Sequence, residues 1–201
     1  ANNVDRAFCV PGESYLAALD ALHGAPSIDL MTCRQESGAA MMADAYGKLT
    51  GKPGICFVTR GPGATNASAG VHIAFQDSTP MILFVGQVGR EMRDREAFQE
   101  IDFRRMFGQM TKWVAEIDDA ARVPEYVSRA FHTAVAGRPG PVVLALPEDM
   151  LRDRAPSVEI TAAHINEAHP GTDAMEELRN RLERAERPLV IVGGGGWDAV
   201  A

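Results

Sequence analysis

The sequence is poor in the residues that mark several common classes of protein. Only three of its 201 residues are cysteines, and 6% are aromatic. The cysteines, Cys9, Cys33 and Cys56, are odd in number and fit neither a disulfide framework nor the spacing of a zinc site. Each lies in an apolar run typical of a strand or strand end. We therefore expect buried, reduced thiols in a cytoplasmic protein.

Positive charge and long apolar runs are also scarce. Lysine and arginine total 20 against 27 aspartates and glutamates, giving a formal net charge of −7. Without a basic stripe, the composition argues against a nucleic-acid partner. No apolar run approaches the roughly 18 residues of a membrane span, and no secretory signal precedes Val4, so we expect no membrane partner. No two histidines have metal-ligand spacing, so no metal site is predicted in this chain.

The sequence does contain a regular alternation of strand-like and helix-like segments. Short apolar runs predict strands at Ala7–Val10, Asp29–Thr32, Ile55–Thr59, Met81–Val85, Trp113–Ile117 and Val142–Leu146. Helical patterns fall between them, at Ser14–Leu22, Glu36–Thr50, Ala64–Phe75 and Pro124–Ala136. Continuous apolar strands are typical of a sheet buried on both faces. We predict an α/β fold with a doubly wound, mainly parallel six-stranded sheet and helices on both faces.

The composition changes after Leu146 and suggests a second unit. The chain becomes polar and irregular, then resumes with a charged helix predicted at Thr172–Ala185 and a strand predicted at Pro188–Val192. That strand runs into the glycines 193–196, a weak glycine-rich motif. We expect a domain over residues 1–150, a linker over 151–171 and the start of a truncated central domain over 172–201.

Glu36 opens the second predicted helix and has two interpretations. A first-turn carboxylate is stabilised by the helix dipole and can cap free N–H groups, which is a structural role. In a water-poor pocket the same carboxyl could exchange a proton with a heterocyclic nitrogen of a ligand. The small residues that follow, Ser37 to Ala40, suit either a close ligand or tight helix packing.

Two glycine-containing loops follow predicted strands. Gly61-Pro62-Gly63 opens a helix and leaves N–H groups free for an anion. However, Asn66 replaces the third glycine of a dinucleotide fingerprint, and no P-loop Lys-Ser/Thr pair is present, so a tight structural turn is the alternative. Pro11-Gly12 occupies the corresponding place after the first strand.

Loops at the carboxyl ends of parallel strands line the ligand crevice of an open α/β sheet. We therefore expect several polar residues to gather at one edge: Glu13, Ser14, Arg34, Arg60 and the Gln76–Ser78 loop. The alternative for Glu13 and Ser14 is that one of them caps the next helix.

Taken in order, these motifs resemble the N-terminal, pyrimidine-binding domain of thiamine diphosphate-dependent enzymes, most closely the acetolactate synthase branch. The resemblance covers about residues 4–150. It is carried by residues 10–12, 34–40, 43–47, 51–54, 61–66, 77–80, 86–88, 97–100, 137–142 and 146–147. Residues 188–196 resemble the start of the family's central domain.

The resemblance implies roles for particular residues. Glu36 would hydrogen-bond the cofactor's aminopyrimidine and so activate the cofactor as a carbon nucleophile toward a 2-keto acid. Gln99 would be a second catalytic residue. Cofactor contacts are implied for Pro11, Gly12, Glu36, Gly61, Gly63 and Asn66, and substrate contacts for Glu13, Ser78, Phe98 and Lys112.

The resemblance also implies components beyond this chain. Thiamine diphosphate would bind with Mg²⁺, whose Gly-Asp-Gly…Asn-Asn ligand motif is absent here, and FAD is possible in the central domain. The active site would lie between subunits of a homodimer or homotetramer, so we expect this chain alone to be inactive.

The sequence departs from the family at two pocket positions. Glu13 stands where the synthases carry glycine, and Ser78 stands where benzoylformate decarboxylase-like members place a histidine, which argues against that branch. Other readings stay open: another carboligase, a 2-keto acid or acyl-CoA decarboxylase, or a non-catalytic α/β nucleotide-binding module.

Overall fold

The computed structural model describes residues 2–158, 160–162, 169–191 and 193, and its main feature is a six-stranded parallel sheet. The strands are β1 (Arg6–Cys9), β2 (Asp29–Thr32), β3 (Gly54–Val58), β4 (Met81–Gln87), β5 (Trp113–Glu116) and β6 (Pro141–Pro147). Their order is β2-β1-β3-β4-β6-β5, and every neighbouring pair is parallel. The predicted fold class is confirmed.

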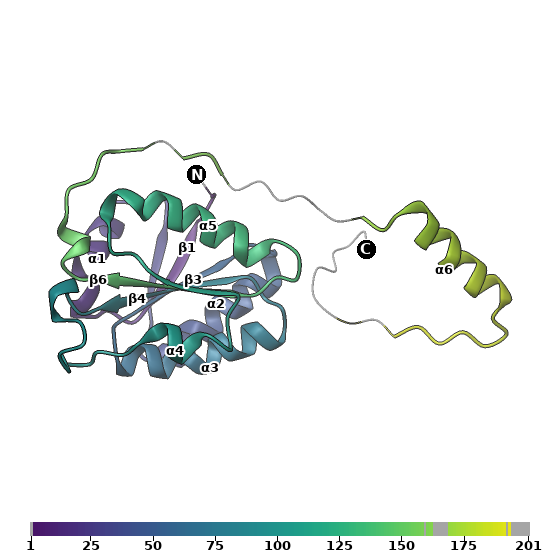
Figure 1. Cartoon of the computed structure of the whole chain (residues 1–201), viewed down its shortest axis with the longest axis horizontal. Coiled ribbons are helices and arrows are strands. Elements are labelled where there is room, and N and C mark those ends of the chain that lie inside the picture. Colours follow the sequence, from purple (N-terminus) through teal and green to yellow (C-terminus); the bar gives the residue numbers. More distant parts are fainter. Residues whose placement is uncertain (1, 159, 163–168, 192, 194–201) are drawn as a thin grey trace.

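Helices cover both faces of the sheet (Figure 1). They are α1 (Leu16–His23), α2 (Glu36–Thr50), α3 (Pro62–Gln76), α4 (Phe103–Phe107) and α5 (Val123–Val135), with short 3-10 turns at Glu13–Tyr15, Ala120–Arg122, Arg90–Met92 and Met150–Arg152. One apolar core joins α2, α3 and α4 to the sheet, and a second joins α1 and α5 to the other face.

The central strands are apolar along their whole length because both faces are covered. Every residue of β3, β4 and β6 is buried. Helices α2 and α3 pack against each other through small side chains, and a Cβ placed on Gly70 would lie 2.6 Å from the Cβ of Ala40. This close packing holds the two helices side by side.

The predicted strands and helices of the sheet domain agree with the structure to within about two residues at each end. Helix α4 was not predicted. It spans only five residues, too few to show a helical apolar period, and it is held by Asp102, whose side chain accepts a hydrogen bond from the Arg105 N–H at 3.1 Å.

The C-terminal segment contains one helix, α6 (Thr172–Arg184), as predicted. Every described residue from 171 to 191 is exposed, and α6 lies apart from the sheet domain (Figure 1). The predicted strand at Pro188–Val192 is wrong for residues 188–191, which form no strand, and residue 192 lies outside the described residues. Leu189 is 85% and Ile191 88% exposed, and none of the described residues forms a strand beside them to provide the hydrogen-bonded partner that a strand needs. Of the glycines 193–196, only Gly193 is described.

The three cysteines are free thiols, as expected. Cys9 and Cys56 are buried, but Cys33 is only partly buried. Burial raises the pKa of all three, which keeps them protonated and poorly reactive. Among the described residues, no helix has the length and apolar character needed to cross a bilayer.

Candidate active site at the carboxyl edge of the sheet

The site lies where the strand order changes direction, between β1 and β3. The chain leaves β1 toward β2 on one side, and β3 pairs with β1 on the other, which is where open α/β sheets bind ligands. The loops after the two strands touch: the Ser14 and Thr59 hydroxyls lie 2.8 Å apart. A Cβ on Gly12 would lie 2.5 Å from the Thr59 Cβ, so only glycine permits this approach.

Tyr15 supports this corner from within the sheet domain. Its buried hydroxyl donates to the Val10 carbonyl at 2.5 Å, and its ring stacks on Phe57. Burial raises the pKa of Tyr15, so the phenol remains a neutral donor. The Pro11–Gly12 loop is thereby fixed at its base, with the Pro11 side chain exposed.

Glu36 is the first residue of α2, as predicted, and its carboxylate stands at the rim of this crevice. The structural role weighed for it is performed by its neighbour: Gln35 is the N-cap and accepts a hydrogen bond from the Gly38 N–H at 3.0 Å. Glu36 is half-buried and accepts a hydrogen bond from Asn66 Nδ2 at 3.0 Å. Asn66 is itself fixed, because its carbonyl accepts from the Ser37 hydroxyl at 2.7 Å.

Gly63 lets the start of α3 pack closely beside this carboxylate. A Cβ on Gly63 would lie 3.6 Å from Glu36 Oε1 and 2.8 Å from the Thr59 Cγ2. The corner therefore combines a carboxylate acceptor with backbone that carries no side chain at the start of α3. A carboxylate acceptor suits a ligand that presents a ring N–H to Glu36.

Gly61 brings the loop after β4 onto the same corner. Its φ is +58°, and a Cβ there would lie 2.6 Å from the Gln99 Cβ. Gln99 also has a positive φ, +65°. The loop is held by Glu100, whose carboxylate accepts from the Asp94 N–H at 2.8 Å and the Ala97 N–H at 3.1 Å. Phe98 is 73% exposed on this loop.

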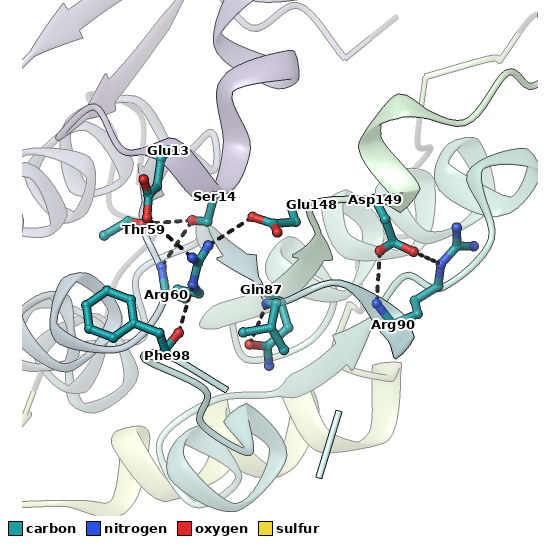
Figure 2. Close-up of polar contacts among 10 residues, drawn as sticks. Glu13, Ser14, Thr59, Arg60, Gln87, Arg90, Phe98, Glu148 and Asp149 are labelled. Carbon is teal, nitrogen blue, oxygen red and sulfur yellow. Dashed lines mark hydrogen bonds and ion pairs between the residues drawn. The ribbon is translucent and has the colours of Figure 1, made fainter. Parts of the chain in front are cut away.

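Arg60 joins the loops that surround this corner (Figure 2). Its guanidinium donates from Nε to the Phe98 carbonyl at 3.1 Å, from one terminal nitrogen to Glu148 at 3.1 Å and from the other to Glu13 at 3.4 Å. Its backbone N–H donates to the Ser14 hydroxyl at 3.3 Å. The Arg60 side chain is only 9% exposed.

The sequence analysis placed Glu13 and Arg60 at this edge but missed Glu148. The signal was present, because Glu148 directly follows β6 and the carboxyl ends of parallel strands share one edge. We refer to Glu13, Arg60 and Glu148 as the arginine cluster.

A second arginine fixes the neighbouring rim. Arg90 donates to Asp149 from its backbone N–H at 3.0 Å and from Nε at 2.7 Å, and its terminal nitrogens reach the Asp118 carbonyl and Asp153. Figure 2 shows Arg90 and Asp149 beside the arginine cluster. The loops after β4, β5 and β6 are therefore tied together by one side chain.

Ser78 and Lys112 are not brought to this site in the chain. The prediction that the Gln76–Ser78 loop lies at the carboxyl edge is wrong, because that loop precedes β4 and parallel strands all begin at the opposite edge. Ser78 there accepts a hydrogen bond from Arg138 Nε at 2.7 Å. Lys112 directly precedes β5 and donates to the Ala136 carbonyl at 2.6 Å. Burial lowers the pKa of Lys112.

A cavity of about 630 Å³ lies farther along the carboxyl edge, beneath the loop after β4. Glu116 lines it, and burial raises the pKa of this carboxyl although Arg93 pairs with it. Among the described residues, no group of three or more His, Cys, Asp or Glu side chains is arranged to hold a metal ion.

Comparison with known proteins identifies relatives of the chain. The family described as "Thiamine pyrophosphate enzyme, N-terminal TPP binding domain" matches residues 1–106. The chain is 37% identical to the acetolactate synthase large subunit of Lactococcus lactis over 196 residues, covering 96% of the chain and 34% of that protein.

Two further relatives, from other organisms, are also named acetolactate synthase. The chain is 35% identical to the acetolactate synthase isozyme 3 large subunit of Escherichia coli, covering 98% of the chain and 35% of that protein. It is 33% identical to the mitochondrial acetolactate synthase catalytic subunit of Saccharomyces cerevisiae, covering 96% and 30%. The chain thus spans about a third of the length of these relatives.

Proposed function

Because the chain belongs to the thiamine pyrophosphate enzyme family and contains its N-terminal cofactor-binding domain, we propose that it forms the pyrimidine-binding part of a carboligase or decarboxylase acting on 2-keto acids. Its relatives make acetolactate synthase the most similar activity. The observation that carries the proposal is the position of Glu36, a carboxylate at a helix tip beside closely packed glycine loops at the strand switch point.

The residues around Glu36 fit the cofactor's aminopyrimidine. Thiamine diphosphate, when bound, supplies a carbon nucleophile to the reaction. Glu36 would accept a hydrogen bond from the pyrimidine ring and hold that proton, while Asn66 orients the carboxylate by donating to it at 3.0 Å. Gln35 caps the helix, which leaves the Glu36 carboxylate available to the ligand. Gly12, Gly61 and Gly63 let the surrounding loops pack closely at this corner, because a Cβ at any of the three would clash with Thr59 or Gln99.

The loop after β4 supplies the substrate side of the site. Gln99 is proposed as a catalytic residue because Gly61 holds it next to the start of α3. Phe98 projects from the same loop, 73% exposed, and would exclude water once substrate binds. Pro11, in the loop after β1, and Asn66, in the first turns of α3, are proposed to contact the cofactor at this corner.

The remaining components are proposed from the family resemblance. Mg²⁺ would be held by residues outside this chain, FAD could occupy a central domain that begins at residue 172, and residues 151–171 would link the two domains. The site would be completed by a second subunit in a homodimer or homotetramer. Free thiols at positions 9, 33 and 56 support a reducing compartment such as the cytoplasm.

A 2-keto acid or acyl-CoA decarboxylase is the second candidate, and Glu13 favours it. This carboxylate is 68% exposed at the crevice, where it would discourage binding of a second acid.

The proposal is tested on the full-length gene product that carries these 201 residues. With thiamine diphosphate and Mg²⁺ it should release carbon dioxide from pyruvate or another 2-keto acid, and residues 1–201 alone should show no tight cofactor binding by calorimetry. Full-length protein that binds no cofactor, or residues 1–201 that bind it at micromolar concentration, would contradict the proposal.

A further inference from the structure

Arg60 is held rigidly, and only one of its ionic partners is loosely bound. Nε on the Phe98 carbonyl and the terminal nitrogen on Glu148 are both 3.1 Å contacts. Because these two contacts use different nitrogens of the planar guanidinium, rotating the group would break at least one of them. The third contact, to Glu13, is the longest at 3.4 Å.

Glu13 is also the most solvated member of the arginine cluster. Its side chain is 68% exposed, against 38% for Glu148 and 9% for Arg60. An exposed ion pair of this length contributes little to stability. Glu13 is therefore not needed to compensate the buried guanidinium, because Glu148 already does so.

The charges of the arginine cluster do not cancel. Two carboxylates share one guanidinium, which leaves one surplus negative charge at the crevice. A guanidinium edge is the preferred partner of a carboxylate, since its N–H groups match the two carboxylate oxygens. Glu13 thus occupies the position on Arg60 where a substrate carboxylate would otherwise bind.

A chain of contacts connects this position to the Glu36 carboxylate. Ser14, the neighbour of Glu13, contacts Thr59 at 2.8 Å, and Thr59 packs against Gly63, which lies beside Glu36. The arginine cluster and Glu36 therefore border the same corner of the sheet, within reach of one bound substrate. Figure 2 shows Glu13, Ser14, Thr59 and Arg60 together at this corner.

We propose that Glu13 is a specificity-determining residue that blocks carboxylate binding to Arg60, so that the second substrate of the site is an uncharged carbonyl compound such as an aldehyde. This inference rests on the proposed function. In the reaction, the donor 2-keto acid loses its carboxyl group as carbon dioxide and forms a carbon–carbon bond to the acceptor carbonyl, whose oxygen takes a proton from water. An acidic acceptor is rejected because Glu13 repels its carboxylate.

The experiment lets two acceptors compete for one donor in the full-length protein. Pyruvate serves as donor and as acidic acceptor, and propanal is added as the neutral acceptor, so that any effect on donor binding cancels in the product ratio. Wild type should form mainly the neutral hydroxyketone. In Glu13→Gln the ratio of acidic to neutral product should rise by roughly three- to tenfold, the effect of removing one nearby charge at a hydrated site.

A control and a binding measurement isolate the cause. Glu125→Gln removes a carboxylate that also pairs with an arginine, Arg122 at 2.8 Å, at the start of α5 far along the sheet, and should leave the product ratio unchanged. Lactate, a carboxylate that cannot lose carbon dioxide in this way, should bind Glu13→Gln roughly three- to tenfold more tightly than wild type by calorimetry. The gain should disappear in Glu13→Gln combined with Arg60→Gln.

The outcomes separate the two proposals. If wild type consumes pyruvate but has the same product ratio and lactate affinity as Glu13→Gln, the role of Glu13 is overturned. The proposed function is unaffected by that result. Wild type that leaves 2-keto acids intact counts against the proposed function, and the lactate titration then decides whether Glu13 competes for Arg60. A mainly acidic product from wild type also overturns the inference.

Discussion

The two edges of the parallel sheet use their polar side chains in different ways. At the amino edge, Lys112 donates to the Ala136 carbonyl and Arg138 donates to Ser78 and to the carbonyls of Phe75 and Gln76. These side chains satisfy carbonyls at helix ends, the groups that a helix leaves without partners. All of these hydrogen bonds are formed within one chain.

At the carboxyl edge, polar side chains bond to one another across loops that are distant in sequence. Arg60 and Glu148 are 88 residues apart, and Asn66 and Glu36 are 30 apart. Carboxylates remain partly exposed, and Gln99 adopts a positive φ. The same residue types thus stabilise helix ends at one edge and leave reactive groups available at the other. The following predictions test this division between the edges.

The largest effect is expected for Glu36→Gln at the carboxyl edge. The amide keeps the shape and the Asn66 contact but cannot hold the pyrimidine proton, so turnover and exchange of the cofactor C2 proton should fall at least about a hundredfold. Proton exchange is measured by NMR on the full-length protein, and circular dichroism checks the fold. Unchanged exchange would favour the non-catalytic nucleotide-binding alternative.

Gly61→Ala should destabilise the domain by about 1–3 kcal/mol, measured by urea unfolding, and displace Gln99. Two costs combine here, because φ is +58° and a Cβ would lie 2.6 Å from the Gln99 Cβ. Gly137→Ala is the matched control near the amino edge, with φ +60° and no atom within 4 Å of the added Cβ. Gly137→Ala should lose only the stability that an alanine costs at a positive φ, and it should keep full activity. Equal losses of stability in the two variants would show that the loop carrying Gln99 moves aside for the added Cβ at no cost in free energy.

Ser78→Ala and Lys112→Met test the amino edge. Each removes a hydrogen bond to a neighbouring segment, so unfolding should become easier by about 0.5–1.5 kcal/mol, while kcat and KM of the full-length protein stay within about twofold of wild type. A tenfold loss of kcat in either variant would instead indicate that the residue contributes to a substrate pocket shared with another subunit.

The smallest effect is expected for Glu116→Gln, and it depends on pH. Burial raises the pKa of this carboxyl in the folded state above its unfolded value, so the folded protein binds the proton more tightly and ionisation destabilises it as pH rises. The variant should be more stable than wild type at pH 7, by less than about 1 kcal/mol because Arg93 offsets part of the cost. The gain should vanish below about pH 4.

Stability is measured by urea unfolding at a series of pH values. Glu125→Gln is the control, and its change in stability should have the opposite sign to that of Glu116→Gln. Arg122 lowers the pKa of Glu125, so its ionisation favours the folded state above the unfolded pKa, and the variant should lose stability at neutral pH. If both variants respond to pH in the same direction, the burial of Glu116 is not the cause of its shift.

Much of the sheet domain could be predicted because its information is local. Each strand is a short apolar run, and Glu36 opens the helix that follows the strand Asp29–Thr32, so its place at the carboxyl edge followed from the fold class. The error at Gln76–Ser78 came from assigning a helix-to-strand loop to the carboxyl edge, although such loops precede strands. Helix α4 was not predicted because a five-residue helix is too short to show a helical apolar period. The strand predicted at Pro188–Val192 was wrong for residues 188–191 because an apolar run forms a strand only where a partner strand pairs with it.

The sequence by itself determined the six strands of the sheet and its four longer helices, and that a carboxylate begins α2, because these properties depend on residues near one another in the chain. Only the tertiary structure decided that Arg60 meets Glu13 and Glu148, that Gln35 rather than Glu36 caps the helix, and that Lys112 lies at the far edge. Charges attract over short distances, and the crossover connections of the sheet, not separation in sequence, set those distances.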